Sequence, residues 1–132
     1  MNIGDASERS GVSAKMIRYY EEIGLLRRVG RSANGRRAYG QPDLHRLRFI
    51  RRCRDLGFPI EDVRALLDVM DAKTPSCLSA RDLTLTHLST VRARRDELEA
   101  LERTLTAMAA SCTEACAGGA TPDCTLMEEL AG

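Results

Sequence analysis

The sequence has no tryptophan, and aromatic residues make up only 4% of its 132 residues. A hydrophobic core must therefore be built mainly from aliphatic side chains. No apolar run approaches the roughly 18 residues of a membrane span. The first ten residues, MNIGDASERS, lack the basic start and apolar stretch of a secretory signal. We expect a soluble, cytoplasmic protein with no membrane contact.

Acidic residues are scarce in one part of the chain. Residues 27–54 contain ten arginines and a single acid, Asp43. Residues 1–69 carry fourteen basic and nine acidic side chains, whereas residues 70–132 carry six and ten. A stretch whose charged side chains are nearly all positive is a candidate surface for binding phosphates. The alternative is a set of arginine-rich helices that only aid solubility.

Residues 1–24 have the pattern of two short helices. The first is expected over 3–10, with Asn2 as its N-cap, and the second over 14–22, with Ser13 as its N-cap. Gly11 between them permits a tight turn. Two short helices joined by such a turn predict a helix-turn-helix.

A hairpin is expected next. Residues 31–39 centre on Asn34-Gly35, a strong hairpin signal because both residues tolerate positive φ. Arginines flank this turn on both sides, which is typical of the wing of a winged helix-turn-helix. Two more helices are predicted over 43–56 and 60–70, separated by Gly57-Phe58-Pro59.

The second half of the chain predicts one long helix. No proline or glycine occurs from Ser79 to Cys112. Apolar residues recur at spacings of three and four, interrupted at Arg94 and Arg95: Leu88, Val91, Leu98, Leu101, Leu105, Met108 and Cys112. Residues 1–70 are too small and too distant to cover this stripe, so a coiled-coil-like pairing with a second copy is expected. A glycine-rich loop and a short helix over 124–130 follow.

Several motifs together resemble the MerR family of bacterial transcriptional regulators. They are Met16-Ile17-Arg18-Tyr19-Tyr20-Glu21, Gly24-Leu25-Leu26, Arg31-Ser32-x-Asn34-Gly35-x-Arg37-x-Tyr39 and Leu56-Gly57-Phe58. The resemblance covers residues 1–70 without a gap. Residues 71–132 resemble the metal-sensing branch of the family, close to its copper-efflux regulators in length.

The resemblance implies a mainly α fold in four parts. These are a winged helix-turn-helix DNA-binding domain over 1–70, a linker over 71–78, a long antiparallel coiled-coil dimerisation helix over 79–112, and a metal-binding loop with a terminal helix over 112–132.

The resemblance also implies which residues meet DNA. Lys15, Arg18 and Tyr20 would face the major groove or its phosphates. The wing would contact the backbone through Arg31, Asn34, Arg36, Arg37 and Tyr39, with Arg36 replacing a tyrosine that many relatives carry. Independently, the helical spacing places Lys15, Arg18 and Glu22 on one face. One of Tyr19 and Tyr20 is expected to pack in the core.

Five cysteines point to metal or redox chemistry, since thiols stay reduced in the cytoplasm. Cys53 lies on an apolar helix face and is expected in the core. Cys116 and Cys124 flank a polar loop that has no reason to bury thiols, and their spacing equals that of the two ligands in copper-efflux regulators. Cys112 continues the apolar stripe, so it is either a stripe residue or a ligand.

Cys77 bears on which metal is sensed. A helix over 79–112 is about 50 Å long, so Cys77 cannot reach the loop of its own chain. In an antiparallel pair it lies beside Cys112, Cys116 or Cys124 of the second copy. By the resemblance, Cys at this position is typical of Zn(II), Cd(II), Pb(II) and Hg(II) sensors, and Ser of copper and silver sensors. The cysteine count therefore favours a divalent ion, and the loop length favours Cu(I).

We therefore expect a homodimer on a pseudo-palindromic operator in double-stranded promoter DNA. By the resemblance, it would activate a metal efflux or detoxification promoter by distorting the DNA until RNA polymerase engages. The alternatives are a Cu(I), Ag(I) or Au(I) sensor and a thiol redox-stress sensor. A regulator of organic ligands would need an aromatic-lined effector domain, which nothing after Met70 supplies. An enzyme is not expected, because His45 and His87 are isolated.

Overall fold

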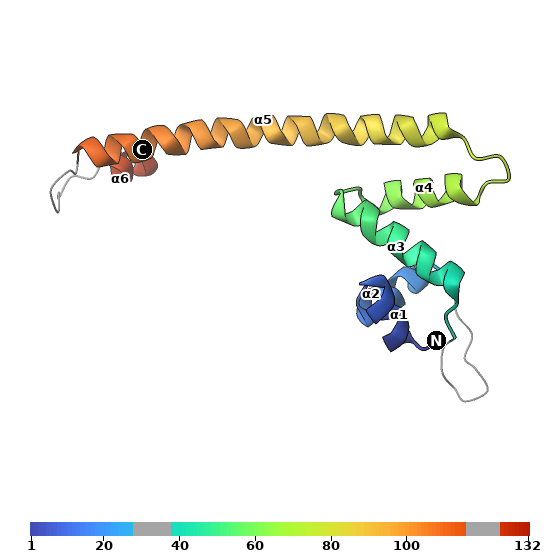
Figure 1. Cartoon of the computed structure of the whole chain (residues 1–132). Coiled ribbons are helices and arrows are strands. Elements are labelled where there is room, and N and C mark those ends of the chain that lie inside the picture. Colours follow the sequence, from blue (N-terminus) through green and yellow to red (C-terminus); the bar gives the residue numbers. More distant parts are fainter. Residues whose placement is uncertain (28–37, 116–124) are drawn as a thin grey trace. The chain divides into compact units, whose positions relative to one another are not determined.

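The computed structural model describes residues 1–27, 38–115 and 125–132 (Figure 1). Within these residues the secondary structure is α-helical: α1 (Ile3–Ser10), α2 (Ala14–Glu22), α3 (Gln41–Asp55), α4 (Ile60–Asp71), α5 (Cys77–Ala115) and α6 (Thr125–Ala131). The chain divides into a first unit, Met1–Thr84, and a second unit, Leu85–Gly132. The expected hairpin falls mostly on residues 28–37, outside the described residues.

The first two helices have the predicted bounds because their caps form as expected. The Asn2 Oδ1 atom accepts a hydrogen bond from the Asp5 amide at 2.8 Å and starts α1. Gly11 then turns the chain with φ of 75°, a left-handed conformation that favours glycine. The Ser13 hydroxyl accepts from the Met16 amide at 3.2 Å and starts α2.

The core of the first unit is mainly aliphatic, as the scarcity of aromatic residues predicted. Helix α1 packs against α2 and α3, and α3 packs against α4 (Figure 1). Cys53 is 6% exposed among these side chains, so its prediction as a core residue is confirmed. The buried hydrophobic residues are Ala6, Val12, Ile17, Tyr20, Leu25, Leu26, Tyr39, Leu44, Leu47, Ile50, Cys53, Phe58, Val63 and Leu67.

The long helix begins earlier and ends later than predicted. We expected a linker over 71–78, but α4 continues to Asp71 and α5 starts at Cys77. The reason is Ser76, whose hydroxyl accepts from the Ser79 amide at 3.2 Å and whose carbonyl accepts from the Ala80 amide. At its other end α5 continues three residues past Cys112, to Ala115. The short terminal helix spans Thr125–Ala131, and Cys124, its expected first residue, lies outside the described residues.

The leucines of α5 in the second unit lie at the surface. Leu98, Leu101 and Leu105 are each more than half exposed. None of the described helices, the 39-residue α5 included, is apolar enough over a sufficient length to cross a membrane.

Candidate nucleic-acid interface and cysteine positions

Helix α2 has one charged face and one buried face. Lys15, Arg18 and Glu22 are exposed, as their spacing predicted, while Ile17 and Tyr20 are buried beneath them. Within the described part of the chain, the side chains of Lys15 and Arg18 form no ion pair or hydrogen bond. Two cations on one exposed helix face can therefore meet phosphates or base edges without first breaking an internal contact.

Tyr20 does not have the DNA-facing position that was predicted for it. Its side chain is only 5% exposed, and Tyr19 is the exposed member of the pair. Burial raises the pKa of Tyr20 above its ordinary value of 10.0, and the nearby charge of Arg54 offsets part of this rise. The tyrosine ring is a core element that forms part of the wall of a small hollow of about 220 Å³.

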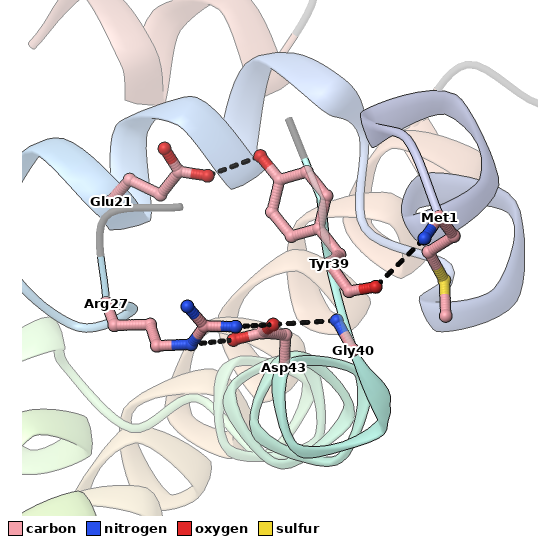
Figure 2. A network of polar contacts seen from close by, with 6 residues as sticks. All are labelled: Met1, Glu21, Arg27, Tyr39, Gly40 and Asp43. Atoms are coloured by element: carbon pink, nitrogen blue, oxygen red, sulfur yellow. Dashed lines mark hydrogen bonds and ion pairs between the residues drawn. The ribbon is translucent and has the colours of Figure 1, made fainter. Parts of the chain in front are cut away.

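Tyr39 was predicted to lie in the wing and contact DNA, and the structure corrects this. Its side chain is 3% exposed, and its hydroxyl donates a hydrogen bond to the buried carboxylate of Glu21 (Figure 2). Its backbone amide donates to the Met1 carbonyl at 2.8 Å, and its carbonyl accepts from the Met1 amino group at 3.0 Å. Tyr39 therefore holds the chain in place where residues 28–37 end.

Several arginines of the basic stretch hold the fold together. Arg27 forms two hydrogen bonds with Asp43, and Arg46 bonds both the Asp71 carboxylate and the Leu25 carbonyl. Arg54 bonds the Phe58 carbonyl, at the turn between α3 and α4. The count of ten arginines against one acid therefore overstates the charge that is free to meet DNA.

Three arginines of α3 belong to the basic stretch of residues 27–54 but had no individual role predicted from the sequence. Arg48, Arg51 and Arg52 line a hollow of about 480 Å³ beside the turn between α1 and α2. The Arg51 guanidinium lies over Gly11, so closely that a Cβ atom there would be 1.9 Å from Nη1. Helical spacing could have grouped Arg48 with Arg52, which lie four residues apart, but not Arg51, which follows Leu44 and Leu47 at the seven- and four-residue spacing of the apolar face. The group adds positive charge next to the start of α2.

The wing residues Arg31, Asn34, Arg36 and Arg37 lie outside the described residues. The same holds for Cys116 and Cys124 of the predicted metal loop.

The described cysteines differ in exposure. Burial raises the pKa of the Cys53 thiol, which disfavours the thiolate that metal binding requires. Cys77 is exposed as the first residue of α5, and Cys112 is half-buried near the other end of that helix. Among the residues that the structure describes, no three His, Cys, Asp or Glu side chains gather into a possible metal site.

Comparisons with known proteins agree with this arrangement. Residues 1–69 match the family described as MerR HTH family regulatory protein, and residues 44–108 match the one described as MerR, DNA binding. The chain is 45% identical to the HTH-type transcriptional regulator HmrR of Rhizobium leguminosarum bv. viciae, covering 98% of this chain and 97% of that protein. It is 33% identical to the HTH-type transcriptional regulator CueR of Salmonella typhi, covering 100% and 93%.

A solved structure matches over nearly the same length. The transcription regulator PbrR691 from Ralstonia metallidurans CH34, in complex with lead(II), superposes with a TM-score of 0.82 at 32% identity, covering 98% of both chains. The helix-turn-helix in the first unit, the long helix α5 and these matches lead to one conclusion. The chain belongs to the MerR family of DNA-binding transcriptional regulators and is not an enzyme.

Proposed function

We propose that this chain is a metal-responsive regulator that activates a metal efflux or detoxification promoter. It acts as a homodimer on a pseudo-palindromic operator and senses a soft divalent ion, Zn(II), Cd(II), Pb(II) or Hg(II), through cysteine thiolates. The observation that carries the choice of ion is Cys77, an exposed thiol at the first position of α5.

The names of the relatives support a response to metals. Two proteins of Rhizobium meliloti, each 40% identical to this chain, are named heavy metal-dependent transcription regulators. The solved structure of the relative PbrR691 is that of its complex with lead(II). A mercuric resistance operon regulatory protein of Bacillus cereus is 33% identical over 85% of this chain.

The donor chemistry fits a soft ion. Thiolates are the ligands that zinc and its heavier relatives prefer, with three or four donors in the usual sites. Cys77 and Cys112 lie at opposite ends of the 39-residue α5, so one chain cannot bring them together through this helix. An antiparallel pair of α5 helices would bring Cys77 of one copy next to Cys112, Cys116 or Cys124 of the other. The exposed leucines of α5 supply an apolar surface for that pairing.

A Cu(I) sensor is the second candidate. The spacing of Cys116 and Cys124 favours it, because this spacing equals that of the two ligands in copper-efflux regulators and two thiolates in line suit Cu(I). Cys77 favours the divalent ion, because each added thiolate brings negative charge that a monovalent ion neutralises less well.

We further propose that the regulator acts by distorting promoter DNA so that RNA polymerase can engage. This mode of action requires the metal-bound and metal-free dimers to bind the operator with similar affinity. A metal-induced loss of affinity of about a hundredfold, or about 2.7 kcal/mol, would instead indicate derepression.

The test replaces Cys77 with serine and measures transcription from the cognate promoter across Cu(I), Zn(II), Cd(II), Pb(II) and Hg(II). We expect Cys77→Ser to lose the divalent responses and keep any response to Cu(I). Cys124→Ser should lose both, because its loop belongs to either site. Cys53→Ala is the matched control, since it removes a thiol that the core buries and should leave every response intact.

Two outcomes of this test would change the proposal. Divalent responses by Cys77→Ser equal to those of the wild type would overturn the cross-subunit site in favour of copper. A wild type that responds only to oxidants, and that contains no metal after anaerobic purification, would identify a thiol redox-stress sensor.

A further inference from the structure

The turn that follows helix α2, residues 23–25, is held by two arginines from other helices. Arg64 of α4 donates through Nη2 to the Ile23 carbonyl at 2.6 Å. Arg46 of α3 donates through Nε to the Leu25 carbonyl at 2.7 Å. The carbonyls at the end of a helix have no intrahelical partner, so these two bonds fix the turn from outside.

Arg46 also holds the end of α4. Its Nη1 atom donates to both carboxylate oxygens of Asp71 at 2.9 Å, and Asp71 is the last residue of α4. The guanidinium is planar and its N–H groups point in fixed directions, so the bonds from Nε and Nη1 set the position of one partner relative to the other. We call residues 23–25, Arg46, Arg64 and Asp71 the α2–α4 link.

The link contributes orientation more than stability. The Asp71 side chain is 51% exposed, and an ion pair that solvent reaches stabilises a fold only weakly. The described helices that pack against one another over several residues are α1 with α2, α1 with α3, and α3 with α4, so α2 and α4 are not such a pair. Leu25 and Val63 belong to the same hydrophobic core, but apolar burial is non-directional. The directional bonds of the link therefore specify the angle between α2 and α4.

An open hollow lies beside the link. Gly24, Arg46, Met70 and Asp71 are among the residues that line this hollow of about 590 Å³. A close-packed contact would hold the ends of α2 and α4 by steric exclusion. Beside a hollow, their relative position depends on the hydrogen bonds.

Helix α4 leads directly to the exposed thiol on which the choice of ion rests. Residues 72–76 connect Asp71 to Cys77, the first residue of α5 (Figure 1). This connection contains no glycine, and Pro75 restricts its backbone. All of these residues belong to the first unit. A displacement of the start of α5 is therefore passed to the end of α4 through a short, restrained segment.

We propose that Arg46 and Arg64 are positioning residues that carry a change at the start of α5 to the DNA-facing helix α2. With the link closed, a shift of Asp71 moves the Leu25 carbonyl through Arg46, and the end of α2 moves with it. With the link open, the turn absorbs the same shift and α2 stays in place. This inference rests on the proposed function, the metal-dependent distortion of promoter DNA. Both arginines act through the turn that they hold, without contacting metal or DNA.

One variant opens the link without changing the charge of the chain. Arg46→Lys keeps the positive charge, but an ammonium group lacks the fork that reaches two partners at once. Arg103→Lys is the matched control, since Arg103 is an exposed arginine of α5 off the apolar stripe. Asp71→Asn opens the link from its other side. Its control is Asp68→Asn, because Asp68 is exposed on the same helix and forms no ion pair within the described residues.

The first measurement needs no metal. The amides of Leu25 and Leu26 donate to the Tyr20 carbonyl, so their hydrogen exchange reports how often the turn opens. In the metal-free whole chain we expect about tenfold faster exchange at both amides in Arg46→Lys, from the loss of a hydrogen bond to a charged donor. Arg103→Lys should exchange like the wild type. Unchanged exchange in Arg46→Lys would overturn the proposal.

The second measurement compares DNA binding with DNA distortion. The probe is a duplex that the wild-type chain selects from a random library, with a fluorescent base analogue at its centre. The ions are Cd(II) and Cu(I), one for each candidate class of metal. For Arg46→Lys we expect wild-type affinity for duplex and ion, but about a tenfold smaller ion-induced shift in the equilibrium between undistorted and distorted duplex. Asp71→Asn should also lose part of this shift, and Asp68→Asn should keep it.

A double-variant cycle tests whether Arg46 and Asp71 act as one unit. Once Arg46→Lys has opened the link, adding Asp71→Asn should cause little further loss, because the bond that it removes is already broken. Additive losses would overturn the proposal, as would a lost response that only follows a lower affinity for the ion or the duplex. If the wild type distorts the duplex with neither ion, the proposed function fails. If the wild type distorts it and Arg46→Lys does so equally, the link alone is wrong.

Discussion

The role of each arginine in the first unit depends on what lies beside it. Arg27 and Arg46 face buried or half-exposed carboxylates, and Arg54 and Arg64 bond backbone carbonyls at the ends of helices. The Arg64 contact satisfies a carbonyl that the end of α2 leaves unpaired, and the carboxylate contacts are charge-assisted hydrogen bonds. Arg18 is different, because its side chain forms no such contact within the described residues.

Arg18 and Arg37 should therefore have different effects on DNA binding. Arg18→Ala is expected to weaken binding to the operator by roughly 1–3 kcal/mol, the range for a good base-edge contact. Arg37→Ala, a supposed phosphate contact, should weaken specific and nonspecific binding alike and lower the slope against salt by about one. Salt titrations on operator and scrambled duplexes measure both effects.

Arg103→Ala is the control for these two variants, since Arg103 is an exposed arginine of α5 outside the first unit and off the apolar stripe. It should bind both duplexes like the wild type. Equal salt slopes for Arg18→Ala, Arg37→Ala and the wild type would contradict the proposed division of roles.

The buried thiol of Cys53 makes the free energy of unfolding depend on pH. Burial raises the pKa of its thiol above the ordinary value of 9.0, so the unfolded chain ionises at a lower pH than the folded chain. The buried Cys53 thiol makes its full contribution to the free energy of unfolding below about pH 9. This contribution is lost as the pH rises toward the pKa of Cys53 in the folded chain. Tyr20, with its raised pKa, acts in the same direction at higher pH.

Urea unfolding midpoints, measured from neutral pH to about pH 10, test this dependence. The wild-type midpoint should fall above about pH 9. Cys53→Ala should be less stable at neutral pH by about 1 kcal/mol, through the lost packing, and should fall less steeply with pH. An alkaline decline equally steep in both chains would show that Cys53 is not its source.

At the scale of elements, local signals predicted the helices well. Side-chain caps at Asn2 and Ser13 and the glycine turn at Gly11 act within three residues, so the bounds of α1 and α2 could be read from the sequence. The start of α5 was missed by two residues, because serine caps are common and Ser76 was not distinguished from its neighbours. Apolar periodicity also predicted the buried position of Cys53.

Partners distant in the sequence were not predictable in the same way. Tyr39 follows an arginine-rich turn and was therefore assigned to the DNA surface. The structure pairs its hydroxyl with Glu21, which lies eighteen residues earlier, on α2. Asp43 was noticed only as the single acid of the basic stretch, and its bond to Arg27 required the fold. One sequence shows residue types and spacing, but not which distant side chains meet.

At the scale of the whole molecule, α5 has an apolar surface that the described chain leaves exposed. Leu98 and Leu101 are 58% and 57% exposed, and Leu105 is 63% exposed. Burying one such side chain contributes about 1.5–3 kcal/mol. A stripe of leucines along one helix is therefore a strong reason for pairing with a second copy.

The last prediction tests this pairing through one leucine. Leu98→Glu places a charge in the apolar stripe and should convert the dimer to a monomer, because burying that charge is unfavourable. Sedimentation at micromolar concentration should give twice the 14.6 kDa of one chain for the wild type and one chain mass for the variant. Ala100→Glu is the control, since it adds the same charge at an exposed position off the stripe.

The same variants connect the dimer to DNA recognition. A monomer carries one helix-turn-helix, so Leu98→Glu should lose the extra affinity for a duplex with two half-sites and bind it like a single half-site. Ala100→Glu should keep the preference for the pseudo-palindrome. A wild type that sediments as a monomer, or a Leu98→Glu variant that remains a dimer, would contradict pairing through this stripe. The cross-subunit metal site built on Cys77 would then lose its geometric basis.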